Sequence, residues 1–197
     1  GFCLTADSAI YGRRERDKIK NFKPSGRSKV TGTNYQSQLD WNVVKSLRRR
    51  TKLPLIIKGI ATEEDATIAV DHGIDIVYIS NHGGRQLDHG SGSIEVLPEI
   101  VNAINNQATI IVDGGFYRGT DIIKAIALGA DLVGLGRLYG FGLAAFGQAG
   151  VERVLEILEE EIFSAMALLG VTKLSDLNTN FVRPAKSVRQ PGLTSAF

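Results

Sequence analysis

Five short apolar runs alternate along the chain with longer stretches that have the periodicity of amphipathic helices. The apolar runs cover residues 1–7, 53–59, 74–79, 109–113 and 131–135, and each is followed by polar or glycine-rich sequence. Such bounded runs are typical of buried strands. The helical patterns cover residues 39–51, 62–72, 93–104, 120–128, 138–147 and 151–169. This alternation predicts a parallel sheet covered by helices.

Local signals mark several of the expected helix ends. Thr62 followed by Asp65 resembles a capping box, which begins a helix. Gly73, Gly129 and Gly170 each stand where a helical pattern stops, and glycine at this position readily adopts the left-handed conformation that ends a helix.

Two segments do not fit the strand and helix pattern. The polar stretch 11–38 is rich in Gly, Ser, Lys and Arg and is too long for an ordinary connection. We expect a mobile loop at about 18–38. From residue 178 the chain carries Pro184, Pro191 and few apolar residues, which predicts an extended, partner-dependent tail. The expected organisation is one domain at 1–177 and a tail at 178–197.

The positions of the polar residues favour a barrel over an open doubly wound sheet. Chemically reactive residues follow all five predicted strands, and in a barrel such loops converge on one face. An open sheet concentrates its ligand contacts at one switch point. A complete barrel requires eight strands and about 250 residues. The expected fold class is therefore α/β, the C-terminal part (about five βα units) of a TIM (β/α)8 barrel, with the N-terminal strands missing from this chain.

Composition narrows the functional classes. The 197 residues are 43% hydrophobic and 22% charged, with a formal net charge of +2. This balance gives no indication of nucleic-acid or membrane binding, and no apolar run approaches the ~20 residues of a membrane span. The single Cys3 excludes an internal disulfide. The three histidines (His72, His82, His89) lack zinc-ligand spacing, so no metal site is expected.

The segment Ser80-Asn81-His82-Gly83-Gly84-Arg85-Gln86-Leu87-Asp88 places a proton acceptor three residues before a cation. Histidine titrates near neutral pH, and the guanidinium of arginine matches a carboxylate. A structural histidine is the commoner reading of His82 when the segment is taken alone. The combination with the other loops favours a substrate site.

Six motifs in order make the chain resemble the C-terminal portion of the FMN-dependent L-2-hydroxy acid oxidases and dehydrogenases, the family of glycolate oxidase, flavocytochrome L-lactate dehydrogenase and mandelate dehydrogenase. The resemblance runs from residue 2 to about residue 177. The motifs are Leu4-Thr5-Ala6-Asp7, Gly12-Arg13-Arg14-Glu15-Arg16-Asp17, Ile57-Lys58-Gly59, Ser80 to Asp88, Asp113-Gly114-Gly115 with Arg118-Gly119-Thr120-Asp121, and Gly134-Leu135-Gly136-Arg137. The resemblance implies FMN as cofactor and oxidation of a lactate, glycolate or mandelate type of 2-hydroxy acid to the 2-keto acid.

The resemblance also implies roles for the catalytic residues. His82 takes a proton from the substrate, from carbon or from oxygen, and Asp7 orients His82 and stabilises its protonated form. Arg85 and Arg14 bind the substrate carboxylate. Lys58 lies beside the flavin, where a cation stabilises negative charge.

For cofactor binding, the resemblance implies that Thr5 and Ser80 contact the flavin. It assigns the FMN phosphate to residues after the last two strands: Asp113, Gly114, Gly115, Arg118, Gly136 and Arg137. At one position the chain departs from the family, because Tyr117 stands where an arginine is usual. This predicts one cationic phosphate contact fewer.

Other readings remain open. An inosine monophosphate dehydrogenase type of barrel needs a loop cysteine as nucleophile, whereas Cys3 lies inside a predicted strand. A catalytically inactive barrel fragment that binds phosphate or flavin at most is compatible with the pattern. Expected partners are the small 2-hydroxy acid, the missing N-terminal half of the barrel and, by family resemblance, further copies in a tetramer. Oxygen, a cytochrome and a quinone are all open as electron acceptor.

Overall fold

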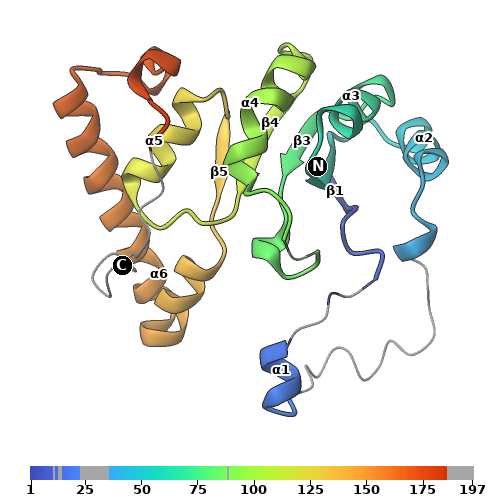
Figure 1. Cartoon of the computed structure of the whole chain (residues 1–197), viewed down its shortest axis with the longest axis horizontal. Coiled ribbons are helices and arrows are strands. Elements are labelled where there is room, and N and C mark those ends of the chain that lie inside the picture. The colour runs from blue at the N-terminus through green and yellow to red at the C-terminus, as the bar shows by residue number, and fades with distance from the viewer. Residues whose placement is uncertain (11, 13–14, 23–35, 88, 186–197) are drawn as a thin grey trace. The chain divides into compact units, whose positions relative to one another are not determined.

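The computed structural model describes residues 1–10, 12, 15–22, 36–87 and 89–185, and strands and helices alternate along them as the sequence predicts (Figure 1). The chain divides into two compact units, Gly1–Gly114 and a second unit that begins at Gly115. The apolar pattern indicated no boundary there.

The first unit is built on a parallel sheet. Its strands are β1 (Phe2–Thr5), β2 (Leu55–Ile60), β3 (Ile76–Ile79) and β4 (Thr109–Asp113), and they pair in the order in which they occur along the chain. The helices between them are α2 (Trp41–Arg50), α3 (Glu63–Asp71) and α4 (Ser93–Ile104). Parallel pairing requires such crossovers, because each strand must begin again at the same edge of the sheet.

The register of the sheet aligns the candidate side chains at the ends of the strands. Thr5 pairs with Lys58, and Lys58 pairs with Tyr78 on β3. The register between β2 and β3 shifts after Lys58, where Gly59 has a φ of +104°. This irregularity interrupts the ladder, which continues with Ile60 opposite Ile79, beside the candidate site residue Lys58.

Apolar strand residues and one face of α4 form the core of the first unit. Leu55, Val77, Ile79 and Val112 have no exposed side-chain surface, and Leu97 and Ile100 of α4 are equally buried. Burial of each such side chain contributes about 1.5–3 kcal/mol to folding. The core thus holds the strand ends, and the loops that follow them, in fixed positions.

Two side-chain caps define where helices of this unit begin. The carboxylate of Asp40 accepts a hydrogen bond of 2.9 Å from the backbone N–H of Val43 at the start of α2. The hydroxyl of Thr62 accepts from the N–H of Asp65 at 3.2 Å, which confirms the predicted beginning of α3. Each cap satisfies a donor that the helix leaves unpaired.

The second unit contains α5 (Gly119–Ala127), β5 (Leu132–Gly134), α6 (Arg137–Leu169) and two short 3-10 turns, η3 (Leu174–Asp176) and η4 (Thr179–Phe181). A small core joins α5 to the residues after α6: Ile123, Ala127 and Leu177 are buried, and Phe181 and Val182 pack against them. The first residues of the predicted tail therefore belong to this core.

The two helices predicted at 138–147 and 151–169 are joined in the structure as α6, with a sharp kink. Phe146 and Gly147 depart from helical geometry, with φ values of −144° and +60°. The two predicted helices are therefore both present, one on either side of this kink, and share the label α6.

The described part of the polar stretch contains two short helical elements that the sequence pattern did not indicate. The structure has a short helix α1 (Glu15–Ile19) and a 3-10 turn η1 (Gln36–Gln38) within the polar stretch. Most of the expected mobile segment, and the end of the expected tail, lie outside the described residues. In the part of the chain that is described, no helix has both the length and the apolar character needed to cross a membrane.

Candidate functional site

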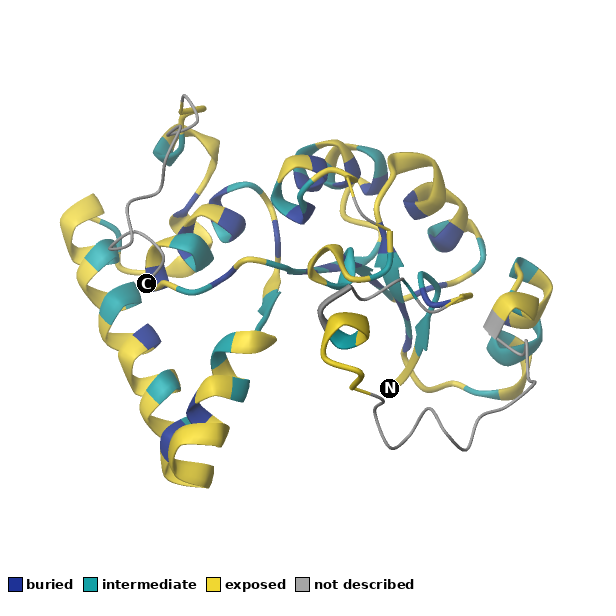
Figure 2. Ribbon diagram, turned by 60° about the horizontal axis from the view of Figure 1, so that its bottom comes forward, coloured by how far each residue is buried: buried dark blue, intermediate teal, exposed yellow. Residues whose placement is uncertain are grey.

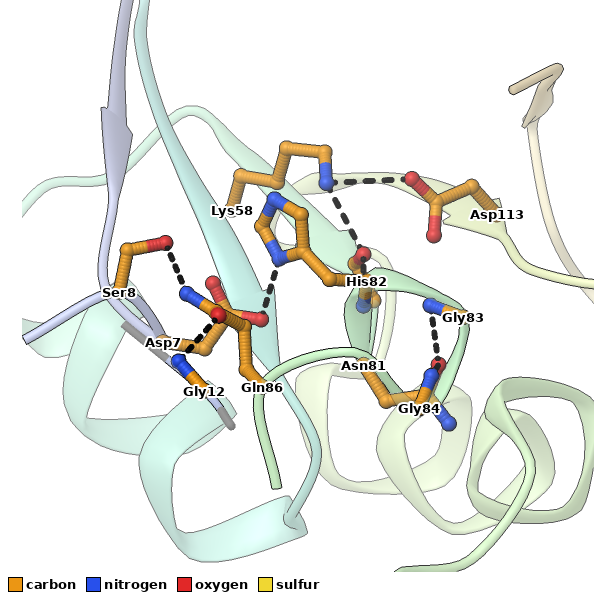
Figure 3. Close-up of polar contacts among 11 residues, drawn as sticks. Asp7, Ser8, Gly12, Lys58, Asn81, His82, Gly83, Gly84, Gln86 and Asp113 are labelled. Atoms are coloured by element: carbon orange, nitrogen blue, oxygen red, sulfur yellow. Dashed lines mark hydrogen bonds and ion pairs between the residues drawn. The ribbon is translucent and has the colours of Figure 1, made fainter. Parts of the chain in front are cut away.

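His82 and Asp7 lie in contact at the end of the sheet of the first unit (Figure 3). The Nδ1 atom of His82 is 2.5 Å from the Oδ2 atom of Asp7, and 32% and 17% of their side chains are exposed. A neutral imidazole that donates from Nδ1 to a carboxylate keeps its free lone pair on Nε2. The pair therefore has the geometry of a general base and the carboxylate that orients it.

The backbone of the loop that carries His82 has an uncommon conformation. His82, Gly83 and Gly84 all have positive φ values, of 52°, 65° and 72°. The side chain of Asn81 stabilises this turn by accepting hydrogen bonds from the N–H groups of Gly83 at 2.9 Å and Gly84 at 3.3 Å (Figure 3). A positive φ at a residue other than glycine costs free energy and is most frequent at functional sites.

Gly59 allows Asp7 to approach the end of β2. A Cβ atom at Gly59 would lie 2.6 Å from both Cγ and Oδ1 of Asp7, a distance that real side chains do not reach. Asp7 Oδ1 is buried and has no hydrogen-bond partner among the described residues. The absence of a side chain at Gly59 therefore makes room for the carboxylate that contacts His82.

The ammonium of Lys58 is held at the ends of β2, β3 and β4. Its Nζ atom donates to Ser80 Oγ at 2.9 Å and forms an ion pair of 3.2 Å with Asp113 Oδ2 (Figure 3). It also lies 4.9 Å from the centre of the ring of Tyr78. Ser80 is buried, and its hydroxyl also accepts from the N–H of His82 at 3.2 Å.

Burial, followed by the negative charge of Asp113 and a hydrogen bond to it, raises the pKa of Tyr78 to about 12. Sequence reasoning missed this residue, although strand alternation places it on the same face of β3 as Ser80.

Three further residues of the first unit were expected in the site, namely Thr5, Arg85 and Arg14. Thr5 lies beside Lys58 in the register of β1 and β2 and is half-buried. Arg85 follows the 3-10 turn η2 (His82–Gly84) and is exposed. Arg14 lies outside the described residues.

Gln86, which sequence reasoning did not single out, connects two loops of the site. Its carboxamide donates from Nε2 to Ser8 Oγ at 2.9 Å and accepts at Oε1 from the N–H of Gly12 at 3.0 Å (Figure 3). Gly12 packs so closely that a Cβ there would lie 2.2 Å from the carbonyl oxygen of Arg85. These contacts tie the loop after β1 to the loop after β3.

In the second unit, Arg118 pairs with Glu161 of α6. The Nε and Nη2 atoms of Arg118 each lie 2.7 Å from Glu161 Oε1. The other carboxylate oxygen, Oε2, accepts from the backbone N–H of Gly119 at 2.6 Å. The guanidinium expected to bind phosphate therefore has a strong partner inside its own unit.

Two of the three glycines expected near phosphate leave open space around their Cα atoms. A Cβ atom at Gly115 or Gly136 would meet nothing within 4 Å, whereas one at Gly114 would lie 3.1 Å from Ser93 Oγ. Arg137 is exposed at the first position of α6. Of the residues that the structure describes, no three His, Cys, Asp or Glu side chains are grouped as metal ligands.

Comparison with known protein families gives one match over most of the chain. Residues 1–184 match the family described as FMN-dependent dehydrogenase. The L-lactate oxidase of Nostoc sp. (strain PCC 7120) is 42% identical over 203 residues, which cover 91% of this chain and 56% of that protein. The peroxisomal (S)-2-hydroxyacid oxidase GLO4 of Arabidopsis thaliana is 40% identical over 199 residues, which cover 91% and 55%.

The fold is similar to that of a solved protein. A crystal structure of mandelate oxidase with 3,3-difluoro-2-hydroxy-3-phenylpropionic acid has a TM-score of 0.80 and 43% sequence identity. The match covers 88% of this chain and 52% of that chain. The chain spans about half the length of the relatives it matches, in agreement with the predicted fold class, part of a (β/α)8 barrel.

Proposed function

Because this chain belongs to the FMN-dependent dehydrogenase family, we propose that the protein oxidises an L-2-hydroxy acid to the corresponding 2-keto acid with bound FMN. The observation that carries the proposal is the contact of 2.5 Å between His82 Nδ1 and Asp7 Oδ2, beside the ammonium of Lys58. A proton acceptor and a fixed cation at one edge of the sheet are the two groups that such an oxidation requires.

The side chains of the first unit fit a flavin ring. The rim of the flavin pyrimidine carries carbonyl oxygens and ring nitrogens, and the structure presents a cation and hydroxyls at the strand ends: Lys58, Ser80 and Thr5. Ser80 Oγ accepts from Lys58 and from the N–H of His82, so its own proton is free for a further acceptor. When bound, FMN accepts the two electrons that leave the substrate.

The roles of the catalytic residues follow from their contacts. Asp7 holds the Nδ1 proton of His82, which leaves Nε2 to take a proton from the hydroxy acid. As His82 becomes positively charged, the carboxylate of Asp7 stabilises it at short range. Arg85 offers a planar guanidinium for the substrate carboxylate, and Arg14 is proposed for the same function from family resemblance.

For the phosphate of FMN, family resemblance supports a role for the residues after β4 and β5. These are Asp113, Gly114, Gly115, Arg118, Gly136 and Arg137. Two contacts modify this assignment. The carboxylate of Asp113 forms an ion pair with Lys58 and would repel a phosphate, so Asp113 could contact the phosphate only through its backbone. Arg118 is paired with Glu161, which leaves Arg137 as the preferred cation.

We also propose that the protein forms homo-oligomers, a tetramer by family resemblance. The supporting observation is the apolar surface of α6, a helix that is exposed along much of its length (Figure 2). Phe146, Phe163 and Leu168 are 79%, 74% and 90% exposed. Multi-angle light scattering of the full-length protein tests this proposal, and a monomeric mass would contradict it.

The test of the reaction is flavin reduction by L-lactate, glycolate and L-mandelate in a stopped-flow instrument. In the full-length protein, His82→Gln is expected to leave FMN bound and to lower the rate by about 10²–10⁴, the usual contribution of general acid–base catalysis. Arg85→Lys is the companion variant, expected to raise the KM and lower the rate, because an ammonium does not reproduce a two-point contact. Parental reduction rates in His82→Gln would refute the proposed base.

A further inference from the structure

The ammonium of Lys58 is enclosed by three different kinds of group. Ser80 supplies a hydroxyl at 2.9 Å, Asp113 a carboxylate oxygen at 3.2 Å, and Tyr78 an aromatic face whose centre lies 4.9 Å from Nζ. The side chains of Lys58 and Asp113 are each only 18% exposed. Their positions come from neighbouring strands in register, so the enclosure is a property of the sheet.

The three groups act differently on the charge of the ammonium. An aromatic face attracts a cation through its quadrupole and leaves the full charge on the cation. Asp113 attracts it too, but the negative charge of Asp113 cancels part of the field that the ammonium exerts on its surroundings. The phenol of Tyr78 is neutral at physiological pH, and burial and Asp113 raise its pKa further, so Tyr78 adds no second negative charge.

We propose that Tyr78 is a positioning residue for Lys58. Its ring keeps the ammonium in an ion pair of 3.2 Å with Asp113, longer than the ~2.8 Å of a full charge-assisted hydrogen bond, and so preserves the positive field at the flavin. The proposal rests on the proposed function, since it assumes that flavin lies near Lys58. Asp113 then acts as the opposing charge that moderates this field. Neither side chain is a flavin ligand in this assignment.

The proposal predicts opposite effects for the two neighbours of Lys58. A positive charge binds reduced flavin, which is more negative, in preference to oxidised flavin. Removal of the ring of Tyr78 lets the ammonium approach Asp113, which weakens the preference. Removal of the charge of Asp113 strengthens it.

The first measurement is the midpoint potential of FMN in the full-length protein, obtained by dye equilibration. Tyr78→Leu should lower the preference for reduced over oxidised FMN about tenfold, equivalent to about 30 mV for a two-electron couple. Asp113→Asn should raise it by a similar factor. Tyr78→Phe is the control for the ring: it keeps the ring and removes the hydroxyl that hydrogen-bonds Asp113, and its change should be smaller than that of Tyr78→Leu. A parental potential in Tyr78→Leu would overturn the proposal.

The second measurement needs no flavin, so it separates this proposal from the proposed function. The ring of Tyr78 should shift the ε-methylene NMR signals of Lys58 upfield in the flavin-free protein. The shift should persist in Tyr78→Phe and disappear in Tyr78→Leu. Should Tyr78→Leu not fold, Tyr78→Met, which also lacks a ring, replaces it and should likewise abolish the shift. Lys58 signals without an upfield shift in the parent would overturn the proposal even if FMN binds.

Discussion

Glu161 forms an ion pair with Arg118 and also caps the N-terminus of α5. Glu161 Oε1 lies 2.7 Å from two nitrogen atoms of Arg118, and Glu161 Oε2 accepts the backbone N–H of Gly119 at 2.6 Å. The carboxylate therefore ties α6 to the first turn of α5. Asp121 completes the turn by accepting the N–H groups of Tyr117 and Arg118 at 3.1 Å and 3.0 Å.

The two partners of this pair should differ in their effect on stability. Glu161→Ala removes the ion pair and the acceptor of the Gly119 N–H, and should lower the free energy of unfolding by about 1–2 kcal/mol. Arg118→Ala removes the ion pair of a half-exposed arginine but leaves the acceptor of the Gly119 N–H in place, and should cost less than about 1 kcal/mol. Urea unfolding measures both. Arg153→Ala, which breaks an exposed pair on the same helix, is the control with a change near zero. A larger loss in Arg118→Ala than in Glu161→Ala would contradict the capping role.

Tyr117→Arg should tighten FMN binding in the full-length protein. Tyr117 stands where the family usually has an arginine, and the guanidinium of Arg118 is held by Glu161. A new charge-assisted hydrogen bond to phosphate contributes about 1.5–3 kcal/mol, which corresponds to roughly a tenfold or greater fall in Kd. Fluorescence titration of the apoprotein measures the Kd. Tyr117→Phe is the matched control and should bind as the parent does. An unchanged Kd in Tyr117→Arg would show that other groups already neutralise the phosphate.

Gly59→Ala should disturb the contact between Asp7 and His82. The new methyl group would lie 2.6 Å from the carboxylate of Asp7, and the backbone has a φ of +104°. Strain of this kind costs about 1–3 kcal/mol, and the displaced carboxylate should reduce the rate of flavin reduction. Gly73→Ala is a useful comparison, because its φ is +76° but its Cβ would meet only the Cδ and Cγ atoms of Arg48, at 3.1 Å and 3.4 Å. We expect Gly73→Ala to lower stability without changing the pH profile of the reaction. An unchanged pH profile in Gly59→Ala would argue against the positioning of Asp7.

Tyr78 should make stability depend on pH in the alkaline range. Burial and Asp113 raise the pKa of Tyr78 from 10.0 to about 12. The unfolded chain releases this proton near pH 10 whereas the folded protein keeps it, so rising pH favours the unfolded chain. The contribution is complete below about pH 10 and is lost as the pH rises to about 12. Urea unfolding of the parent and of Tyr78→Phe should show a stability difference that changes only in this window. A difference that is constant from pH 9 to 12 would contradict the raised pKa.

The sequence alone determined the order of the strands and helices and showed that polar or charged residues follow each strand. Strands and helices follow from the spacing of apolar side chains, which acts over a few residues, and the cap at Thr62 is equally local. His82 and Arg85 were recognisable because they lie three residues apart in one loop. The two helices on either side of the kink at Gly147 were likewise predicted from the local spacing of apolar residues.

The tertiary structure decided which side chains meet, and the apolar pattern did not. Asp7 and His82 are 75 residues apart and were linked beforehand by family resemblance alone, whereas nothing linked Arg118 to Glu161, 43 residues away. Their contacts depend on strand register and on how α5 packs against α6, and no local periodicity encodes either. The role of Tyr78 next to Lys58 likewise required the register of β2 and β3. The local pattern therefore identified candidate residues, whereas long-range packing determined which of them are in contact. The reason is that a hydrogen bond or ion pair depends on distances in space and not on separation along the chain.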